Sequence, residues 1–195
     1  MAKTMWKPGT FIYPIPAVMV SCGDMEKSNI ITVAWTGILN TNPAICYISV
    51  RPERYSYNII KDTGEFVINL TSKELTYATD WCGVKSGREF DKFKEMNLTK
   101  EKSNFVKCPS IKESPVSVEC KVKEIKELRK PYYVYSRSII NKCRWKVHWW
   151  KRRLWYNKMQ FSCLCKWKIF WTWKTSRKIR VFCSKEKIIG VYLWK

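Results

Sequence analysis

The chain has 195 residues, which fits one domain or one domain with an extension, and its 46% apolar and 27% charged residues exclude a disordered protein. A single histidine, His148, excludes any catalytic or metal site that needs two. The net charge of +21 is uneven, because residues 1–128 carry 18 Lys and Arg against 15 Asp and Glu, whereas residues 129–195 carry 19 against one. The two segments are therefore considered separately.

Five short runs of β-branched and apolar residues predict strands in the first segment. They span residues 17–21, 29–35, 45–50, 66–70 and 116–122, and turn signals such as Asn42-Pro43 and Thr63-Gly64 separate them. Phe11 to Val20 holds two prolines, so we expect it to lead into the first strand rather than to be a signal peptide. No apolar run is long enough to span a membrane. The pattern predicts a mainly β barrel or sandwich.

Three polar segments between the strands predict short helices over residues 52–61, 72–81 and 85–96. The first opens with a proline at the first helical position, where its missing N–H costs nothing. The second opens with a serine that can cap the free N–H groups of its first turn. The third is highly charged and has two phenylalanines at helical spacing.

The first segment has five cysteines, scattered one to an element: Cys22, Cys46, Cys82, Cys108 and Cys120. No Cys-x-x-Cys pair occurs, and the segment has no histidine, so we expect no metal site. We interpret these cysteines as buried free thiols in a reducing compartment, the cytoplasm. There is also no glycine-rich phosphate loop of the kind found in nucleotide-binding folds.

One stretch has the residues of a phosphate site. Arg51 directly follows the predicted strand at 45–50, and Pro52-Glu53-Arg54-Tyr55-Ser56 opens the next helix. Free backbone N–H groups and the dipole at a helix N-terminus favour an anion, and arginine can bind a phosphate through two N–H groups at once. A solvated surface turn is the alternative interpretation, and the spacing alone does not choose between them.

Several pieces of the first segment resemble one family when taken together. They are Asn29-Ile-Ile-Thr-Val-Ala-Trp35, Tyr47-Ile-Ser-Val-Arg-Pro-Glu-Arg-Tyr-Ser56, Gly64-Glu-Phe-Val-Ile-Asn69, Asp91-Lys-Phe93 and Tyr13-Pro-Ile-Pro16. In this order and spacing they resemble the flavin reductase-like family over about residues 5–128. The resemblance implies an FMN-binding split β-barrel with a few short helices, and a homodimer that binds FMN at its subunit interface.

The resemblance also implies a set of cofactor-binding residues. Along the isoalloxazine ring it places Thr32, Ala34, Trp35 and Thr36. At the ribityl phosphate it places Ser49 and Arg51, with Tyr55 and Ser56 nearby, and close to the ring or the nicotinamide it places Lys92 and Phe93. Core packing is the alternative for Trp35 and Phe93, since aromatic side chains serve that purpose more often.

The implied activity is transfer of hydride from NAD(P)H through bound FMN to a small-molecule acceptor such as free flavin or a ferric chelate. The protein then contributes binding, orientation and electrostatics, with no catalytic nucleophile or base of its own. This suits a segment without histidine. Split-barrel relatives also include flavin-binding electron-transfer modules without reductase turnover, which is the alternative function.

Residues 129–195 have a different composition. They contain no alanine and no aspartate, one glycine, one proline and eight of the 11 tryptophans. A folded domain needs more turn residues than this. The abundant Trp, Lys, Arg, Cys and Ile are residues that AT-rich coding DNA yields when it is read out of register.

AT-rich codons for this segment, read one base later, support this interpretation. Lys166 to Lys174 can be written AAA TGG AAA ATA TTT TGG ACT TGG AAA, and one base later the same bases give Asn-Gly-Lys-Tyr-Phe-Gly-Leu-Gly. The product resembles the C-terminal strand of the family. Arg129 to Arg137 permits Gly-Ser-His-Ile-Met-Phe-Ile-Ala-Glu with the same shift, again family-like. We infer a single-base frameshift near Leu128–Arg129.

The frameshift has structural consequences. We expect residues 1–128 to form an incomplete split-barrel domain with unpaired strand edges, and residues 129–195 to form a basic, poorly ordered, non-native tail. Such a tail would bind polyanions nonspecifically, and a second alternative function is nucleic-acid binding with tryptophans stacked on bases. The tryptophans concerned are Trp145, Trp149, Trp150 and Trp155. We expect no specific nucleic-acid partner.

Overall fold

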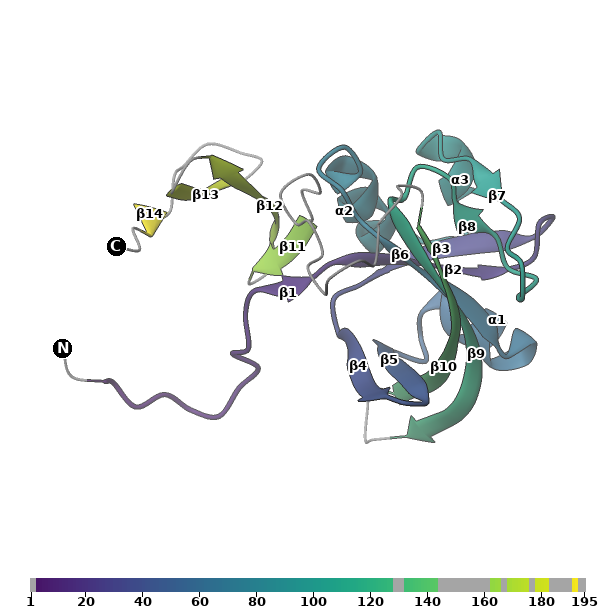
Figure 1. Ribbon diagram of the computed structural model, residues 1–195, viewed down its shortest axis with the longest axis horizontal. Coiled ribbons are helices and arrows are strands. Elements are labelled where there is room, and N and C mark those ends of the chain that lie inside the picture. The colour runs from purple at the N-terminus through teal and green to yellow at the C-terminus, as the bar shows by residue number, and fades with distance from the viewer. Residues whose placement is uncertain are drawn as a thin grey trace.

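A computed structural model describes residues 3–127, 132–143, 162–165, 168–175, 178–182 and 191–192. Its main body is a seven-stranded antiparallel sheet in the order β3-β2-β6-β9-β10-β5-β4 (Figure 1). The strands are β2 (Val18–Gly23), β3 (Ser28–Val33), β4 (Thr36–Thr41), β5 (Ala44–Val50), β6 (Glu65–Leu70), β9 (Val116–Glu127) and β10 (Tyr132–Cys143). All five predicted strands are present, and the predicted mainly β fold is confirmed.

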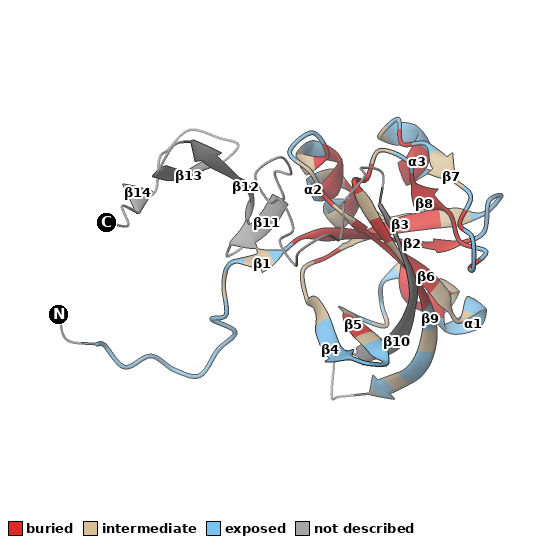
Figure 2. Cartoon of the chain, in the orientation of Figure 1, coloured by how far each residue is buried: buried red, intermediate tan, exposed pale blue. Residues whose placement is uncertain are grey.

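The core lies where the apolar residues of these strands face one another. Val20, Ile48 and Phe66 are fully buried in its largest cluster. Along β5 the burial alternates, because successive side chains of a strand point to opposite faces of the sheet. Burial is concentrated on β2, β3 and β6, whereas residues 3–12 and the outer part of β4 are exposed (Figure 2). The alternation leaves one face of β5 available for a site.

Three short helices accompany the sheet: α1 (Tyr55–Thr63), α2 (Thr76–Val84) and α3 (Lys92–Glu95). α1 begins three residues later than predicted, because Arg54 has the extended backbone of a cap, with φ −74° and ψ 133°. α1 ends at Gly64, whose φ of 67° lies in the left-handed region that glycine adopts without strain. Most of the third predicted helix is loop, because the Asp91 carboxylate caps the N–H groups of Phe93 and Lys94 and starts α3 there.

Strand β4 was not predicted from the sequence. It forms the sheet edge next to β5, and its residues from Ile38 onward are exposed, so its sequence lacks the alternation that marks a half-buried strand. Its second residue is Gly37, where a Cβ atom would lie 2.9 Å from the Tyr47 ring. Glycine therefore permits the close approach of the two strands.

The sheet continues beyond Leu128. β10 lies between β9 and β5 and pairs with both, so the unpaired edge expected after residue 128 is not observed. Strand pairing uses backbone N–H and C=O groups, which every non-proline residue carries whatever its side chain. A second sheet joins β1 (Ile15–Pro16) to β11 (Ser162–Cys165), β12 (Lys168–Thr175), β13 (Lys178–Phe182) and β14 (Val191–Tyr192).

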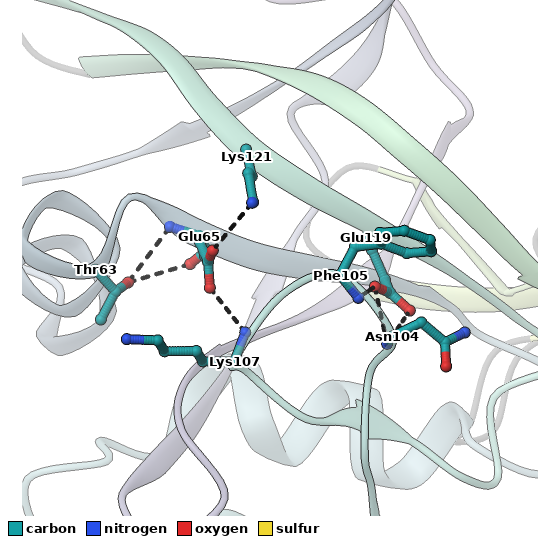
Figure 3. Close-up of polar contacts among 7 residues, drawn as sticks. All are labelled: Thr63, Glu65, Asn104, Phe105, Lys107, Glu119 and Lys121. Carbon is teal, nitrogen blue, oxygen red and sulfur yellow. Dashed lines mark hydrogen bonds and ion pairs between the residues drawn. The ribbon is translucent and has the colours of Figure 1, made fainter.

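Two carboxylates hold the loop between the paired strands β7 (Lys100–Glu101) and β8 (Ser110–Ile111) (Figure 3). Glu119 on β9 is fully buried and accepts hydrogen bonds from the backbone N–H groups of Asn104, at 3.0 and 3.1 Å, and Phe105, at 2.7 Å. Glu65 on β6 accepts from the Lys107 N–H at 2.7 Å and lies 3.9 Å from the Lys121 ammonium. Buried charge is thus matched by converging backbone donors.

The five cysteines of the first segment are buried thiols, as predicted. Burial raises the pKa of the Cys22 thiol to about 12 and that of Cys82 to about 11. Burial also raises the pKa of Cys108. Thiols with such values stay protonated and unreactive at neutral pH, so they act as small apolar core residues.

The first prediction concerns Glu119. We expect Glu119→Ala to lower the free energy of unfolding by about 3 kcal/mol, because the backbone N–H groups of Asn104 and Phe105 lose their shared acceptor and a buried cavity remains. Glu124→Ala on the same strand, at an exposed position, is the matched control and should change the free energy little. Urea unfolding of both variants measures the difference. Equal effects of the two substitutions would contradict a role for the buried carboxylate.

The second prediction concerns pH. The ordinary pKa of a thiol is 9.0, and the pKa of Cys22 in the folded chain is about 12. Between these two pH values only the unfolded chain releases the proton. The contribution of Cys22 to the free energy of unfolding is therefore complete below pH 9 and falls by about 1.4 kcal/mol per pH unit as the pH rises toward the folded pKa. Urea unfolding at pH 8 and pH 10 should show this decline, and Cys22→Ala should make it shallower. An unchanged slope in the variant would refute the assignment to Cys22.

Candidate functional site

The phosphate candidate lies where β5 ends and α1 begins. Arg51 is exposed, and a tight turn follows it, closed by a 3.0 Å hydrogen bond from the Arg54 N–H to the Arg51 carbonyl. Within the described part of the chain, neither arginine side chain forms an ion pair or hydrogen bond. Two unneutralised cations therefore stand beside the N-terminus of a nine-residue helix, whose dipole adds positive potential.

Ser49 adds a hydroxyl to this end of the strand. Its Oγ is buried and has no hydrogen-bond partner among the described residues. Ser28, at the start of β3, is the other described residue with such an atom. A buried hydroxyl without a partner is unfavourable, and an acceptor such as a phosphate oxygen would satisfy it.

The turn between β3 and β4 lies directly against Ser49. The Ser49 N–H donates to the Trp35 carbonyl at 2.8 Å, and the Thr36 hydroxyl donates to the Tyr47 carbonyl at 2.8 Å. Ala34, Trp35 and Thr36 are half-buried, so part of each faces outward. The fold thus brings the residues predicted for the ring beside those predicted for the phosphate.

Thr32 lies on β3, two residues before Ala34. Its hydroxyl donates to the Thr79 carbonyl of α2, and it is half-buried. α2 approaches closely here, since a Cβ atom on Gly83 would lie 3.2 Å from the Thr32 Cβ. Thr32 therefore fixes α2 against β3, and its oxygen keeps a lone pair that can accept a further hydrogen bond.

The two helix residues predicted near the phosphate differ in placement. Tyr55 is half-buried at the first position of α1. Ser56 is buried, and its hydroxyl accepts a 2.8 Å hydrogen bond from the side-chain amide of Asn29. Ser56 thus holds the helix start from beneath and does not present a free hydroxyl to a ligand.

Lys92 and Phe93 face the interior. The Lys92 ammonium donates to the carbonyls of Ile30 and Cys82, at 2.7 Å each, and burial lowers its pKa. Phe93 is buried in the core cluster that includes Met19, Ile30 and Leu75. Core packing, the alternative considered for Phe93, is what the structure has. The structure does not bring these two side chains to the surface that carries Arg51.

Sequence reasoning missed the loop before α3. The Arg88 guanidinium donates to the Glu53 carbonyl at 3.4 Å, so this loop reaches the turn after β5. A Cβ atom on Gly87 would lie 2.2 Å from the Asn29 Oδ1, so only glycine allows the loop to pack here. A glycine inside a charged stretch is a loop signal, and it could have indicated that residues 85–91 are not helical.

Two further classes of site have no support in the part of the chain that is described. No three His, Cys, Asp or Glu side chains gather closely enough there to hold a metal ion. None of the helices in those ranges has the length and apolar character needed to cross a membrane.

The sequence of the chain is similar to those of known proteins. The model of the flavin reductase like domain matches residues 10–134. An uncharacterized protein of Archaeoglobus fulgidus is 33% identical over 112 residues, which cover 57% of this chain and 63% of that protein, so the match spans less than two-thirds of this relative.

Two solved structures share the fold. Flavoredoxin of Desulfovibrio vulgaris (Miyazaki F) has 23% identity and a TM-score of 0.78, covering 97% of each chain. An FMN-binding protein from Thermus thermophilus with bound 1-cyclohex-2-enone has 17% identity and a TM-score of 0.64, covering 73% of this chain and 80% of that one. These similarities confirm the split-barrel fold. Because the family match covers well over half of the chain and includes every predicted site residue, the chain belongs to the flavin reductase-like family.

Proposed function

We propose that the chain binds FMN at the surface formed by the end of β5, the start of α1 and the turn between β3 and β4. The observation that carries the proposal is the 2.8 Å backbone hydrogen bond between Ser49 and Trp35. It joins a cationic strand end to a half-buried turn, as a ligand with an anionic tail and a flat ring requires. Family membership and the FMN-binding Thermus thermophilus neighbour support the choice of FMN.

The chain's residues divide into two groups in this proposal. Arg51, with the Ser49 hydroxyl and the helix N-terminus, binds the phosphate, and Tyr55 lies beside it. Ala34, Trp35 and Thr36, with Thr32 behind them, lie along the isoalloxazine ring. The elements that carry these residues are fixed from the interior by Ser56, Lys92 and Phe93.

Bound FMN would accept hydride from NAD(P)H and pass electrons to a small-molecule acceptor such as free flavin or a ferric chelate. The chain itself binds and orients the cofactor. The nearby thiols Cys22 and Cys82 have raised pKa values and stay protonated, so neither of them supplies a nucleophile. We therefore assign no catalytic residue.

Two other functions were considered. A flavin-binding electron carrier uses the same site, and the resemblance to a flavoredoxin fold favours it as the second candidate. It differs from a reductase only in turnover with NAD(P)H. The nucleic-acid alternative rests on Trp145, Trp149, Trp150 and Trp155, which lie outside the described residues.

We further propose that two copies of the chain assemble at the site. Ile38 and Leu39 on the edge strand β4 are 82% and 50% exposed, close in sequence to the ring-binding turn. Apolar side chains on a sheet edge favour burial against a partner, and a second copy would complete the ring side of the site. The buried cysteine thiols suit the cytoplasm as the location.

The third prediction tests the phosphate site. The purified chain should bind FMN saturably, followed by flavin fluorescence. Arg51→Ala should weaken FMN binding about tenfold or more and leave riboflavin, which lacks the phosphate, nearly unchanged. Lys61→Ala in the last turn of α1 removes a cation at the opposite helix end and serves as the control. Oxidation of NADH or NADPH by the FMN-loaded chain separates the reductase from the electron carrier.

Two results would contradict the proposal. Equal affinities for FMN and riboflavin would exclude a phosphate site. A chain that binds neither flavin would exclude the function for this sequence as it stands. The question would then be whether the reading frame of the gene after Leu128 is correct.

We propose that this frame changes by one base near Leu128–Arg129. The family match ends close to that point, at residue 134. The same forward shift applied to His148–Cys165 permits Ile-Gly-Gly-Lys-Glu-Asp-Tyr-Gly-Ile-Thr-Lys-Cys-Asn-Leu-Val-Ala-Tyr-Ala. The shift restores the glycine, alanine and acidic residues that the printed segment lacks, as expected of a folded domain.

The fourth prediction follows from the shift. A chain with the frame restored after Leu128 should bind FMN more tightly and unfold at higher urea than the printed chain, because native side chains then face the core. Flavin titration and urea unfolding of the two chains measure this. Gene sequencing that gives the printed frame, together with an intact mass that matches the printed chain, would refute the frameshift.

A further inference from the structure

We propose that the N-terminal arm of one copy of the chain, residues 3–12, docks into a groove between α2 and α3 of a second copy. The inference goes beyond flavin binding and uses neither the flavin site nor the edge strand β4. The arm presents apolar side chains and positive charge, whereas the groove presents an apolar floor and negative charge. Each surface therefore offers the chemistry that the other lacks.

The arm exposes several large apolar side chains. Trp6 is 70% exposed, and Met5 and Ile12 are 97% and 87% exposed. The Trp6 ring packs edge-to-face on Phe11, with 5.4 Å between the ring centroids, so the arm already holds a small aromatic cluster. Large apolar side chains gathered on one exposed segment mark an interaction surface.

The arm lies away from the groove of its own chain. All of residues 3–12 are exposed, and the arm leads away from the body of the molecule on the side opposite to α3 (Figures 1 and 2). Ten residues span up to about 35 Å when extended, which is enough to reach a neighbouring copy. Pro8 restricts the backbone of the arm, so docking costs less conformational entropy than it would for an unrestricted segment.

The groove has a volume of about 440 Å³. The buried Leu75 and Leu98 line its floor, and Met96 and the 72% exposed Tyr77 add apolar walls. Ligand pockets in proteins have volumes of about 300–1,000 Å³. The groove is therefore large enough for an aromatic anchor, and tryptophan is the side chain that most often serves as one.

The charges of the groove and the arm are opposite. Three carboxylates line the groove, those of Glu74, Glu95 and Glu113, and no lysine or arginine is among its described lining residues. Glu113 is fixed there, because it accepts hydrogen bonds of 3.0 and 3.2 Å from the Thr99 N–H. The arm carries Lys3 and Lys7 and no acidic residue. This complementarity favours the arm as the occupant of the groove.

The fifth prediction tests the contact by cross-linking with a carbodiimide, which joins an amine directly to a neighbouring carboxylate. The unmodified chain should give peptides in which Lys3 or Lys7 is linked to Glu74 or Glu95. Trp6→Ala keeps the reacting groups but removes the anchor, and should lower the yield about tenfold. Phe105→Ala, which removes a 49% exposed ring outside the arm and the groove, is the control and should leave the yield unchanged. Mass spectrometry of the digested chain measures the yield.

Charge reversal shows which copy supplies the arm. A chain with Lys3→Glu and Lys7→Glu cannot form these links, because its arm has no amine to react. A chain with Glu74→Lys and Glu95→Lys cannot form them either, because both carboxylates are gone. A mixture of the two should restore links between the arm of the first chain and the groove of the second, since opposite charges then meet only between copies.

Three results would overturn the proposal. Absence of arm-to-groove links in the unmodified chain would exclude the docking. Links in the unmodified chain but none in the mixture would show that the arm folds onto its own chain, which excludes the second copy. An unchanged yield in Trp6→Ala would exclude the apolar anchor and reduce the contact to chance encounters of charges. Because no flavin takes part, the test stands whether or not the chain binds FMN.

Discussion

The candidate site depends on the buried side chain of Asn29. Its amide group donates to Ser56 in the first turn of α1, while its carbonyl oxygen lies against the Cα of Gly87. One side chain on β3 therefore sets the position of the helix N-terminus and of the loop that carries Arg88. A buried amide is costly unless it is satisfied, so this arrangement has little freedom to shift. The cationic groups on the surface are therefore held in fixed positions.

The neighbouring residue of β3 extends the same support. The carbonyl of Ile30 accepts a hydrogen bond from the buried ammonium of Lys92, which also reaches the Cys82 carbonyl on α2. Burial lowers the pKa of this lysine, and the two short hydrogen bonds offset part of the cost of burying it. Two consecutive strand residues thus hold α1, α2 and α3. The hydrogen bonds that hold these helices do not involve the surface arginines. The surface can therefore carry several positive charges.

The parts predictable from sequence were those with a local signal. The β-rich run after the Asn42-Pro43 turn located β5, and the arginine and helix start that follow located the phosphate candidate. Edge strand β4 has no such run, because Gly37 and Asn40 interrupt it. The burial of Ser56 and Lys92 depends on partners 27 and 62 residues away, which no local pattern reveals. Arg88 was missed for the same reason, because its contact with Glu53 spans 35 residues.

The position of β10 bears on the coding frame in a limited way. Its pairing with β9 and β5 is made by backbone groups, and the register shifts at two points along β9. A strand of β-branched and aromatic residues can pair in this way whichever frame encodes it, because backbone hydrogen bonding does not read side chains. Side-chain complementarity, in contrast, changes entirely with the frame. Pairing of β10 is therefore compatible with the frameshift, and the decisive difference between the two chains lies in the side chains that face the core and the flavin.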